Sequence, residues 1–158
     1  MRYLKYLRID ERLIHGQVLI KWLEKHESKR VIIIDDAIME NPILISVMQR
    51  SLPKECNLDV YGCEDGARFL SQEVFQYIPM ILVRTVSTLV CLEKEGILFE
   101  KINIARMPYS PGKEEICENV YMDHSEKELI QYYLKKGSSV YVQMVPDSEK
   151  VYLGRIIK

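Results

Sequence analysis

The chain has 158 residues, of which 47% are apolar and 28% are charged, and its net charge is −1. This length and composition fit a single globular domain, residues 1–158, that is large enough to bury a core. The near-neutral charge argues against a nucleic-acid partner, because such domains are usually basic. The longest apolar runs, such as residues 80–83, are far shorter than the ~20 residues that span a bilayer. Charged residues interrupt the first apolar stretch, so it does not resemble a signal peptide, and we expect a cytoplasmic protein.

Short apolar runs alternate with amphipathic segments along the chain. The apolar runs predict strands at residues 3–9, 30–34, 57–61, 80–83, 101–105 and 139–145, with a weaker strand at 116–121. The amphipathic segments predict helices at residues 17–26, 41–51, 64–71 and 87–95, and a last helix that Ser125 and Glu128 cap and that Gly137 ends. This alternation favours an α/β fold: a single-domain open, mostly parallel sheet with helices on both faces. Residues 151–158 follow as an edge strand or a tail.

The turn between the first predicted strand and the first predicted helix carries the most informative residues. Arg12, His15 and Gly16 lie there within five positions. In open parallel sheets, ligands bind beyond the carboxyl ends of the strands, which is where this turn lies. The start of a helix also favours negative charge, so the position suits a histidine that carries an anionic group.

Histidine can act as a nucleophile that forms a covalent intermediate, and a phosphoryl group on imidazole is a reactive carrier. The neighbours of His15 meet the needs of such a group. The guanidinium of Arg12 can bind phosphoryl oxygens with two nitrogens, and the backbone amides of Gly16 and Gln17 point to the same space if the helix begins there. Asp10 either hydrogen-bonds one ring nitrogen or pairs with Arg12 to hold the loop.

Two further groups fall at the same edge of the predicted sheet. Asp35 and Asp36 resemble a magnesium site, but we favour the interpretation that Asp36 or Asn41 caps or braces the next helix. Support of the histidine by Asp36 stays open. Arg84 is either a second phosphate-binding cation, if the strand order is 3-2-1-4, or a surface residue.

The remaining candidates have plainer interpretations. The four cysteines lack any C-x-x-C spacing, and we expect reduced, partly buried thiols rather than a redox pair or a metal site. We interpret His26 and His124 as solvated residues. The polar segment 106–115 is either a partner contact or a mobile connection.

Residues 9–18, with the sequence IDERLIHGQV, resemble the phosphohistidine loop of the enzyme IIB subunits of the bacterial sugar phosphotransferase system, mannose/fructose/sorbose class. Residues 31–36 with Asn41-Pro42, and residues 101–104 and 142–146, are similar to later parts of that family, so the resemblance covers nearly the full length. Only the histidine loop is highly specific. Two departures stand out: Glu11 replaces the aspartate that is more frequent in the family, and Ala105-Arg106 replace frequent glycines.

The resemblance implies a phosphoryl-carrier enzyme of the phosphotransferase system. A phosphorylated IIA protein would phosphorylate Nδ1 of His15, and the group would pass to a sugar held by the membrane subunits IIC and IID. Arg12 would be the main charge partner, with Asp10 in support. The resemblance implies no metal, no nucleotide and only peripheral membrane association, and it leaves open a homo-oligomer. Mannose, fructose, sorbose and amino sugars are all candidate substrates.

Two other functions compete with this interpretation. A receiver-type regulatory module would be phosphorylated on an aspartate with magnesium, but the third predicted strand ends in Tyr61-Gly62, where that mechanism needs an aspartate. A non-catalytic relative that only binds membrane partners is the other alternative, against which the intact histidine loop argues.

Overall fold

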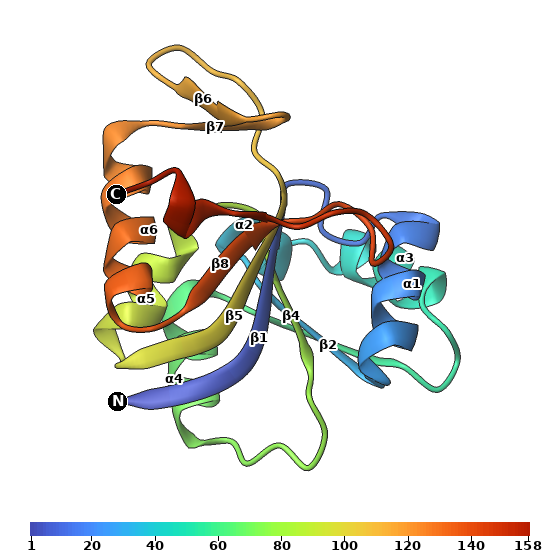
Figure 1. The fold of residues 1–158 in the computed structure, drawn as a ribbon. Coiled ribbons are helices and arrows are strands. Elements are labelled where there is room, and N and C mark those ends of the chain that lie inside the picture. The colour runs from blue at the N-terminus through green and yellow to red at the C-terminus, as the bar shows by residue number, and fades with distance from the viewer.

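The computed structural model describes residues 1–158 and has a seven-stranded central sheet with the order β3-β2-β4-β1-β5-β8-β9 (Figure 1). The strands are β1 (Arg2–Asp10), β2 (Arg30–Ile34), β3 (Asn57–Tyr61), β4 (Met80–Val83), β5 (Ile97–Arg106), β8 (Ser139–Val142) and β9 (Val151–Tyr152). All neighbours pair in parallel except β8 and β9, which are antiparallel. This architecture confirms the predicted open, mostly parallel α/β sheet.

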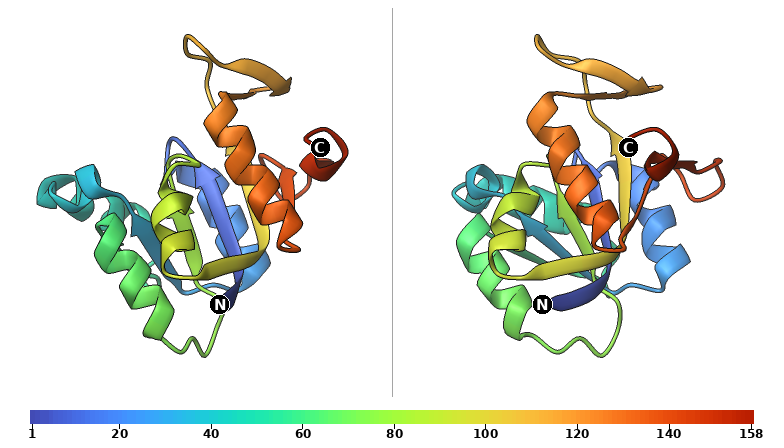
Figure 2. Two further views of the ribbon diagram at one scale, coloured as in Figure 1. Left: turned by 90° about the vertical axis from the view of Figure 1, so that its left-hand side faces the viewer. Right: turned by 60° about the vertical axis from the view of Figure 1, so that its left-hand side comes forward.

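Helices cover both faces of the sheet (Figures 1 and 2). The helices are α1 (Gly16–His26), α2 (Asp36–Met39), α3 (Pro42–Ser51), α4 (Cys63–Gln72), α5 (Thr88–Lys94), α6 (His124–Lys135) and the short 3-10 helix η1 (Leu153–Arg155). One face packs against α4, α5 and α6 in a cluster of 26 buried residues, and the other packs against α1 to α3 in a cluster of 12. Because both faces are covered, β4 and residues 31–34 of β2 are continuous apolar runs.

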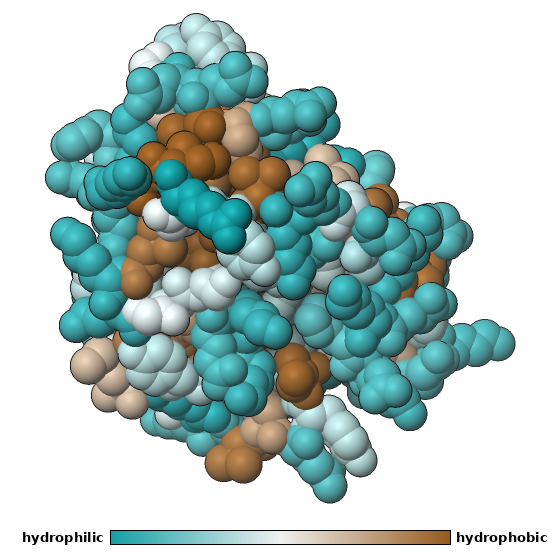
Figure 3. Space-filling model, viewed as in Figure 1, coloured by the Kyte–Doolittle hydropathy of each residue, from teal (hydrophilic) through white to brown (hydrophobic).

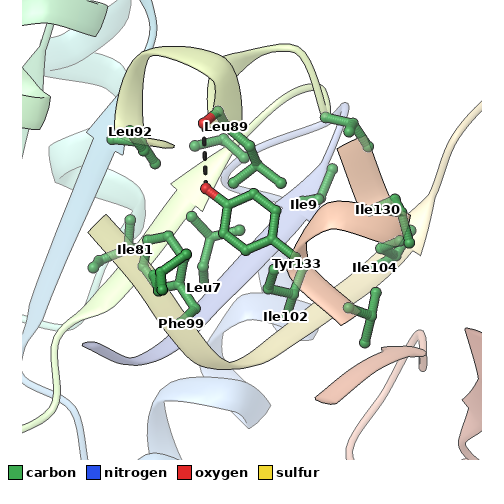
Figure 4. Packing of buried hydrophobic residues seen from close by; sticks show 14 of the residues in the cluster. Leu7, Ile9, Ile81, Leu89, Leu92, Phe99, Ile102, Ile104, Ile130 and Tyr133 are labelled. Atoms are coloured by element: carbon green, nitrogen blue, oxygen red, sulfur yellow. Dashed lines mark hydrogen bonds between the residues drawn. The ribbon is translucent and has the colours of Figure 1, made fainter. Parts of the chain in front are cut away.

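The larger cluster contains Tyr133 of α6, whose ring lies among aliphatic side chains from β1, β4 and β5 (Figure 4). Its hydroxyl donates to the backbone oxygen of Leu89 at 3.2 Å, which satisfies the one polar atom of the side chain and joins α6 to α5. Burial raises the pKa of Tyr133 above its ordinary value, so the phenol stays neutral.

The strand order differs from 3-2-1-4, the order on which the phosphate-binding role of Arg84 was conditioned. In the structure β4 lies between β2 and β1. The four residues of β4 are all buried, which suits a position enclosed by two parallel neighbours and by helices on both faces. Arg84, the residue after β4, still lies beside the end of β1, because Val83 pairs with Ile9.

Residues 116–121 do not add a strand to the central sheet. They belong to a separate antiparallel hairpin of β6 (Glu114–Cys117) and β7 (Val120–Met122), which projects beyond the sheet in Figure 1. Asn119 at its turn has φ of +63°, a left-handed conformation that asparagine tolerates and that reverses the chain.

The start of α6 also differs from expectation. Asp123, rather than Ser125, caps the helix: its side chain accepts from the amide of Glu126 at 2.8 Å, and the Glu126 carboxylate accepts from the Asp123 amide at 3.0 Å. The capping box therefore lies two residues earlier than predicted. At the other end of the helix, Gly137 adopts φ of +94° and stops it, as expected.

The cysteines correct a further expectation. Cys63 and Cys91 form a disulfide across 28 positions of sequence, with their Cα atoms 6.1 Å apart. The bond forms because the parallel topology brings the start of α4 beside α5, a proximity that no local cysteine spacing reveals. Cys56 is free and buried, and Cys117 is free and half-buried, as predicted for these two.

The surface is mainly polar in the view of Figure 3, with an apolar patch below the β6–β7 hairpin near the C-terminal segment. The C-terminal segment itself is anchored, because Leu153 and Ile157 are buried in the larger cluster. No helix combines the length and apolar character needed to cross a bilayer.

Candidate functional site

In the structure, the histidine loop is the linker of residues 11–15 between β1 and α1. The chain bends sharply at Leu13 within this linker and at Gly16 directly after it. Leu13 has φ of +52° and is buried, and its amide donates to the backbone oxygen of Asp10 at 2.9 Å. Gly16 has φ of +43°, a conformation that favours glycine. Because Leu13 anchors the loop in the core, the residues that follow it are held at the carboxyl edge of the sheet.

His15 is exposed at the N-terminal end of α1. Its imidazole makes no capping hydrogen bond, and the first turn of α1 contains no acidic residue. The amides of Gly16 and Gln17, both exposed, belong to the first turn, whose N–H groups have no partner within the helix. The positive end of the helix is thus left for an anion from outside the loop.

Asp10 fixes the position of Arg12. The Oδ1 atom of Asp10 lies 3.0 Å from Nε of Arg12 and its Oδ2 atom lies 3.2 Å from Nη2. The Arg12 amide also donates to Oδ1 at 3.1 Å. Asp10 is almost fully buried, whereas the Arg12 side chain is 24% exposed. Of the two roles that the sequence left open for Asp10, the structure has the pairing with Arg12.

Sequence analysis missed a second arginine beneath this pair. Arg8 of β1 is buried and donates to the backbone oxygens of Gln143 at 3.1 Å and Met144 at 2.8 Å, and also to Oδ1 of Asn103. Its Nη2 atom lies 3.6 Å from Oδ2 of Asp10. Burial lowers the pKa of Arg8 below its ordinary value, but its carbonyl and carboxylate partners favour the cation. The sequence did contain a signal, because Arg8 is a charged residue inside the first predicted strand. A charged side chain in a central strand is buried and needs partners.

Met144 joins this network to the histidine loop. Its backbone oxygen accepts from Nε1 of Trp22 at 3.1 Å as well as from Arg8, and its sulfur lies 3.0 Å from Nη2 of Arg12. Trp22 is buried, as its apolar helix face suggests, and Arg8 lies over its ring with the guanidinium carbon 4.7 Å from the ring centre. The segment after β8 therefore contacts Arg12 through the sulfur of Met144 and contacts Arg8 and Trp22 through the backbone oxygen of the same residue.

Arg84 lies at the same edge but has a partner. Its Nη2 atom donates to Oδ1 of Asp35 at 2.9 Å, and its Nε atom contacts Oδ2 of the same carboxylate. The Arg84 side chain is 41% exposed, so part of the guanidinium faces solvent. Phosphate binding by Arg84 stays a prediction.

The carboxylates that follow β2 act on helix starts. Asp35 caps α2 by accepting from the amide of Ile38 at 2.9 Å, and Asn41 caps α3. Asp36 accepts from the amide of Cys63 at 2.7 Å and so braces the start of α4. The favoured interpretation is confirmed through Asn41, which caps the next predicted helix. The carboxylate of Asp36 instead contacts the start of α4 and is not directed to the histidine loop.

The two departures from the family pattern lie together. Nε of Arg106, at the end of β5, is 2.7 Å from Oε1 of Glu11, and both side chains are partly exposed. Arg106 is also the register partner of Asp10. The carboxyl ends of three adjacent strands therefore carry arginines, each paired with a carboxylate.

His26 is not the solvated residue that we expected. It is half-buried, its ring lies 4.3 Å from that of Tyr6, and its Nε2 atom is buried without a hydrogen-bond partner. Burial, assisted by the charge of Lys25, lowers the pKa of His26 below its ordinary value. The other histidine, His124, has a side chain 84% exposed and matches the expectation.

Comparison with known proteins assigns the family. A model of the family described as "PTS system sorbose subfamily IIB component" matches residues 4–158. The chain belongs to this family. Among curated relatives, the IIB chain is 28% identical to the N-acetylgalactosamine-specific phosphotransferase enzyme IIB component 1 of Escherichia coli (strain K12), with 90% of this chain and 91% of the relative covered. It is 21% identical to the fructose-specific EIIB component of Bacillus subtilis (strain 168), with 88% and 86% covered.

Solved structures agree with this assignment. The IIB chain superposes with a TM-score of 0.86 on manxB from Thermoanaerobacter tengcongensis, at 25% identity and with 99% of this chain and 95% of the other covered. The membership confirms the family resemblance and makes the chain a IIB component of a sugar phosphotransferase system.

Proposed function

We propose that this IIB chain is a phosphoryl carrier. It accepts a phosphoryl group from a phosphorylated IIA protein onto His15 and transfers it to a sugar during uptake through the membrane subunits IIC and IID. One observation carries the proposal: an exposed imidazole lies at an uncapped helix start, three residues after an arginine that a buried carboxylate holds in place. The corresponding activity is that of a protein-Npi-phosphohistidine–sugar phosphotransferase.

The loop offers a group for each requirement of the transfer. When the N–P bond of the donor breaks and a new N–P bond forms on His15, the phosphoryl oxygens need cationic and N–H partners. Arg12 supplies the cation, and the amides of Gly16 and Gln17 supply hydrogen bonds at the positive end of α1. In the second transfer the bond to His15 breaks and the sugar oxygen takes the phosphoryl group. We assign Arg84 as a further cation at the same edge.

The sugar and the membrane partners follow from the family. The relatives compared above are named for N-acetylgalactosamine and fructose, so we propose a hexose or an amino sugar as the acceptor. The IIB chain would dock peripherally on the membrane complex from the cytoplasm. The exposed position of His15 suits docking, because the same imidazole must face a IIA protein and then the membrane subunits.

The test is transfer of labelled phosphate from a charged donor mixture of phosphotransferase proteins. We expect a phosphate on His15 that is labile in acid and stable in base, and no label on His15→Ala. His124→Ala is the matched control, because His124 is exposed but lies outside the loop, and it should label like the unmodified chain.

Two results would contradict the proposal. The first is label that persists on His15→Ala. The second is a requirement for magnesium once the donor is charged, which would favour the receiver-type alternative. The structure gives that alternative little support, because the carboxylates of Asp35 and Asp36 already have protein partners.

A further inference from the structure

The disulfide between Cys63 and Cys91 lies outside the histidine loop but at the same edge of the sheet. Cys63 is the first residue of α4, directly beyond the carboxyl end of β3, and Cys91 lies in the middle of α5. Both residues are half-buried, so solvent reaches the region of the bond. The mechanism proposed above uses neither cysteine.

The bond closes a ring of contacts along this edge. The amide of Cys63 donates to Asp36, and a Cβ atom at Gly62 would lie only 2.9 Å from the same carboxylate oxygen, so the turn before α4 is packed tightly against Asp36. The neighbouring Asp35 holds Arg84. Residues 84–87 lead from Arg84 into α5, which returns to the disulfide through Cys91.

We propose that Cys63 and Cys91 are a reversible redox-modification site whose oxidation orders helix α5 (Thr88–Lys94). The chain exists as a dithiol in a reducing environment and as the disulfide when a low-molecular-weight disulfide is in excess. This proposal is independent of phosphoryl transfer.

The exchange uses a low-molecular-weight disulfide as the oxidant. The thiolate of Cys63 attacks one sulfur of the oxidant, releasing one thiol and forming a mixed disulfide. The thiolate of Cys91 then attacks the Cys63 sulfur and releases the second thiol. Two cysteine thiols are oxidised, one small disulfide is reduced, and the two protons end on the released thiols.

Helix α5 is the element that the bond controls. It has only seven residues, too few for a stable helix without tertiary contacts. Leu89 and Leu92 bury its inner face, and the hydroxyl of Tyr133 contacts its backbone. The disulfide adds a covalent link from α5 to the start of α4, so reduction removes one of the restraints on the helix.

Thiol counting tests the chemistry. The chain is equilibrated in glutathione buffers of increasing oxidised fraction, quenched with acid, denatured, alkylated and weighed by mass spectrometry. We expect four adducts on the reduced chain and two, at Cys56 and Cys117, on the oxidised chain, with full return to four on reduction. Cys117→Ser is the matched control and should lose one adduct in both states. Four adducts in every buffer would overturn the proposal, and so would two adducts that no reductant increases.

Hydrogen exchange tests the structural consequence. We expect the amides of residues 88–92 to exchange at least tenfold faster in the reduced chain than in the oxidised one. Cys91→Ser should show the fast rate in both buffers. Equal rates in the two states of the unmodified chain, or a redox dependence that persists in Cys91→Ser, would overturn the coupling to α5. Both readouts apply whether or not His15 accepts phosphate.

Discussion

Two helices of this chain begin with nearly the same backbone conformation and use it differently. His15 before α1 has φ −120° and ψ 80°, and Asn41 before α3 has φ −119° and ψ 82°. Asn41 accepts a hydrogen bond from the amide of Leu44 at 3.1 Å and so caps its helix, whereas His15 makes no capping bond. The residue before α1 therefore has the backbone conformation of a capping residue, but its side chain does not cap the helix.

The contrast distinguishes a helix start that a side chain of the same chain caps from one that no side chain caps. At α3 the chain satisfies its own N–H groups and gains stability. At α1 the Val18 amide donates to the backbone oxygen of His15, and the amides of Gly16 and Gln17 have no side-chain cap, which is the arrangement that the proposed phosphoryl carrier requires. The same comparison supplies the experiments that follow.

The largest effect is expected from His15→Asn, which copies the cap of α3 onto α1. Phosphate labelling should be abolished, because asparagine cannot carry the phosphoryl group. The free energy of unfolding should rise by about 1 kcal/mol, which raises Tm by roughly 2–4 °C for a chain of this size. Labelling assays and thermal unfolding measure the two effects. A lower Tm would show that a capping side chain at residue 15 does not stabilise the first turn of α1.

Arg12→Ala should give the next largest effect. Loss of a charge-assisted hydrogen bond costs about 1.5–3 kcal/mol, so labelling should slow by at least tenfold. Arg68→Ala is the control, because Arg68 forms an exposed ion pair with Asp65 on α4. Arg12→Lys should also label slowly, since an ammonium cannot bind two phosphoryl oxygens in the same plane. Rates equal to those of Arg68→Ala would remove Arg12 from the site.

Asn41→His reverses the swap and tests α3. We expect the free energy of unfolding to fall by about 1 kcal/mol through loss of the cap, with normal labelling of His15. When Asn41→His is combined with His15→Asn, residue 41 should stay unlabelled, because no arginine lies in the matching position three residues before it. Label at residue 41 would show that an open helix start is sufficient by itself.

The smallest effect concerns the far end of α1, where His26 has a lowered pKa. The unfolded chain binds the proton more readily than the folded one, so the stability contribution is complete above the ordinary value of 6.5 and decreases as pH falls towards the lowered folded value. Urea unfolding at pH 7.5 and pH 5.5 should therefore show that the free energy of unfolding falls less between the two pH values in His26→Gln than in the unmodified chain. The control His124→Gln, at an exposed histidine, should lose as much as the unmodified chain.

The sequence predicted three strands to the residue, because the segments 30–34, 57–61 and 80–83 match β2, β3 and β4. The start of β5 was placed too late, at residue 101, because Glu100 and Lys101 break an apolar run that begins at Ile97. At α6 two capping patterns overlap, and only the tertiary fold selects Asp123 over Ser125.

The candidate site was predictable only where it is contiguous. The histidine loop is a single run of sequence, so its residues could be chosen without knowing the fold. Arg8 and Met144 lie 136 positions apart, and their contact depends on β5 lying between β1 and β8. The Cys63–Cys91 bond likewise depends on how two crossovers place their helices, which local patterns do not encode.

The contacts of Met144 affect the order in which the chain can mature during translation. The histidine loop leaves the ribosome early, yet Arg8, Trp22 and Arg12 all find a partner in a residue near the C-terminus. A nascent chain that ends before β8 would leave the indole N–H of Trp22 and part of the Arg8 guanidinium without their backbone acceptors. His15 is therefore synthesised among the first residues, but its surroundings are completed only when β8 and the segment that follows it have docked.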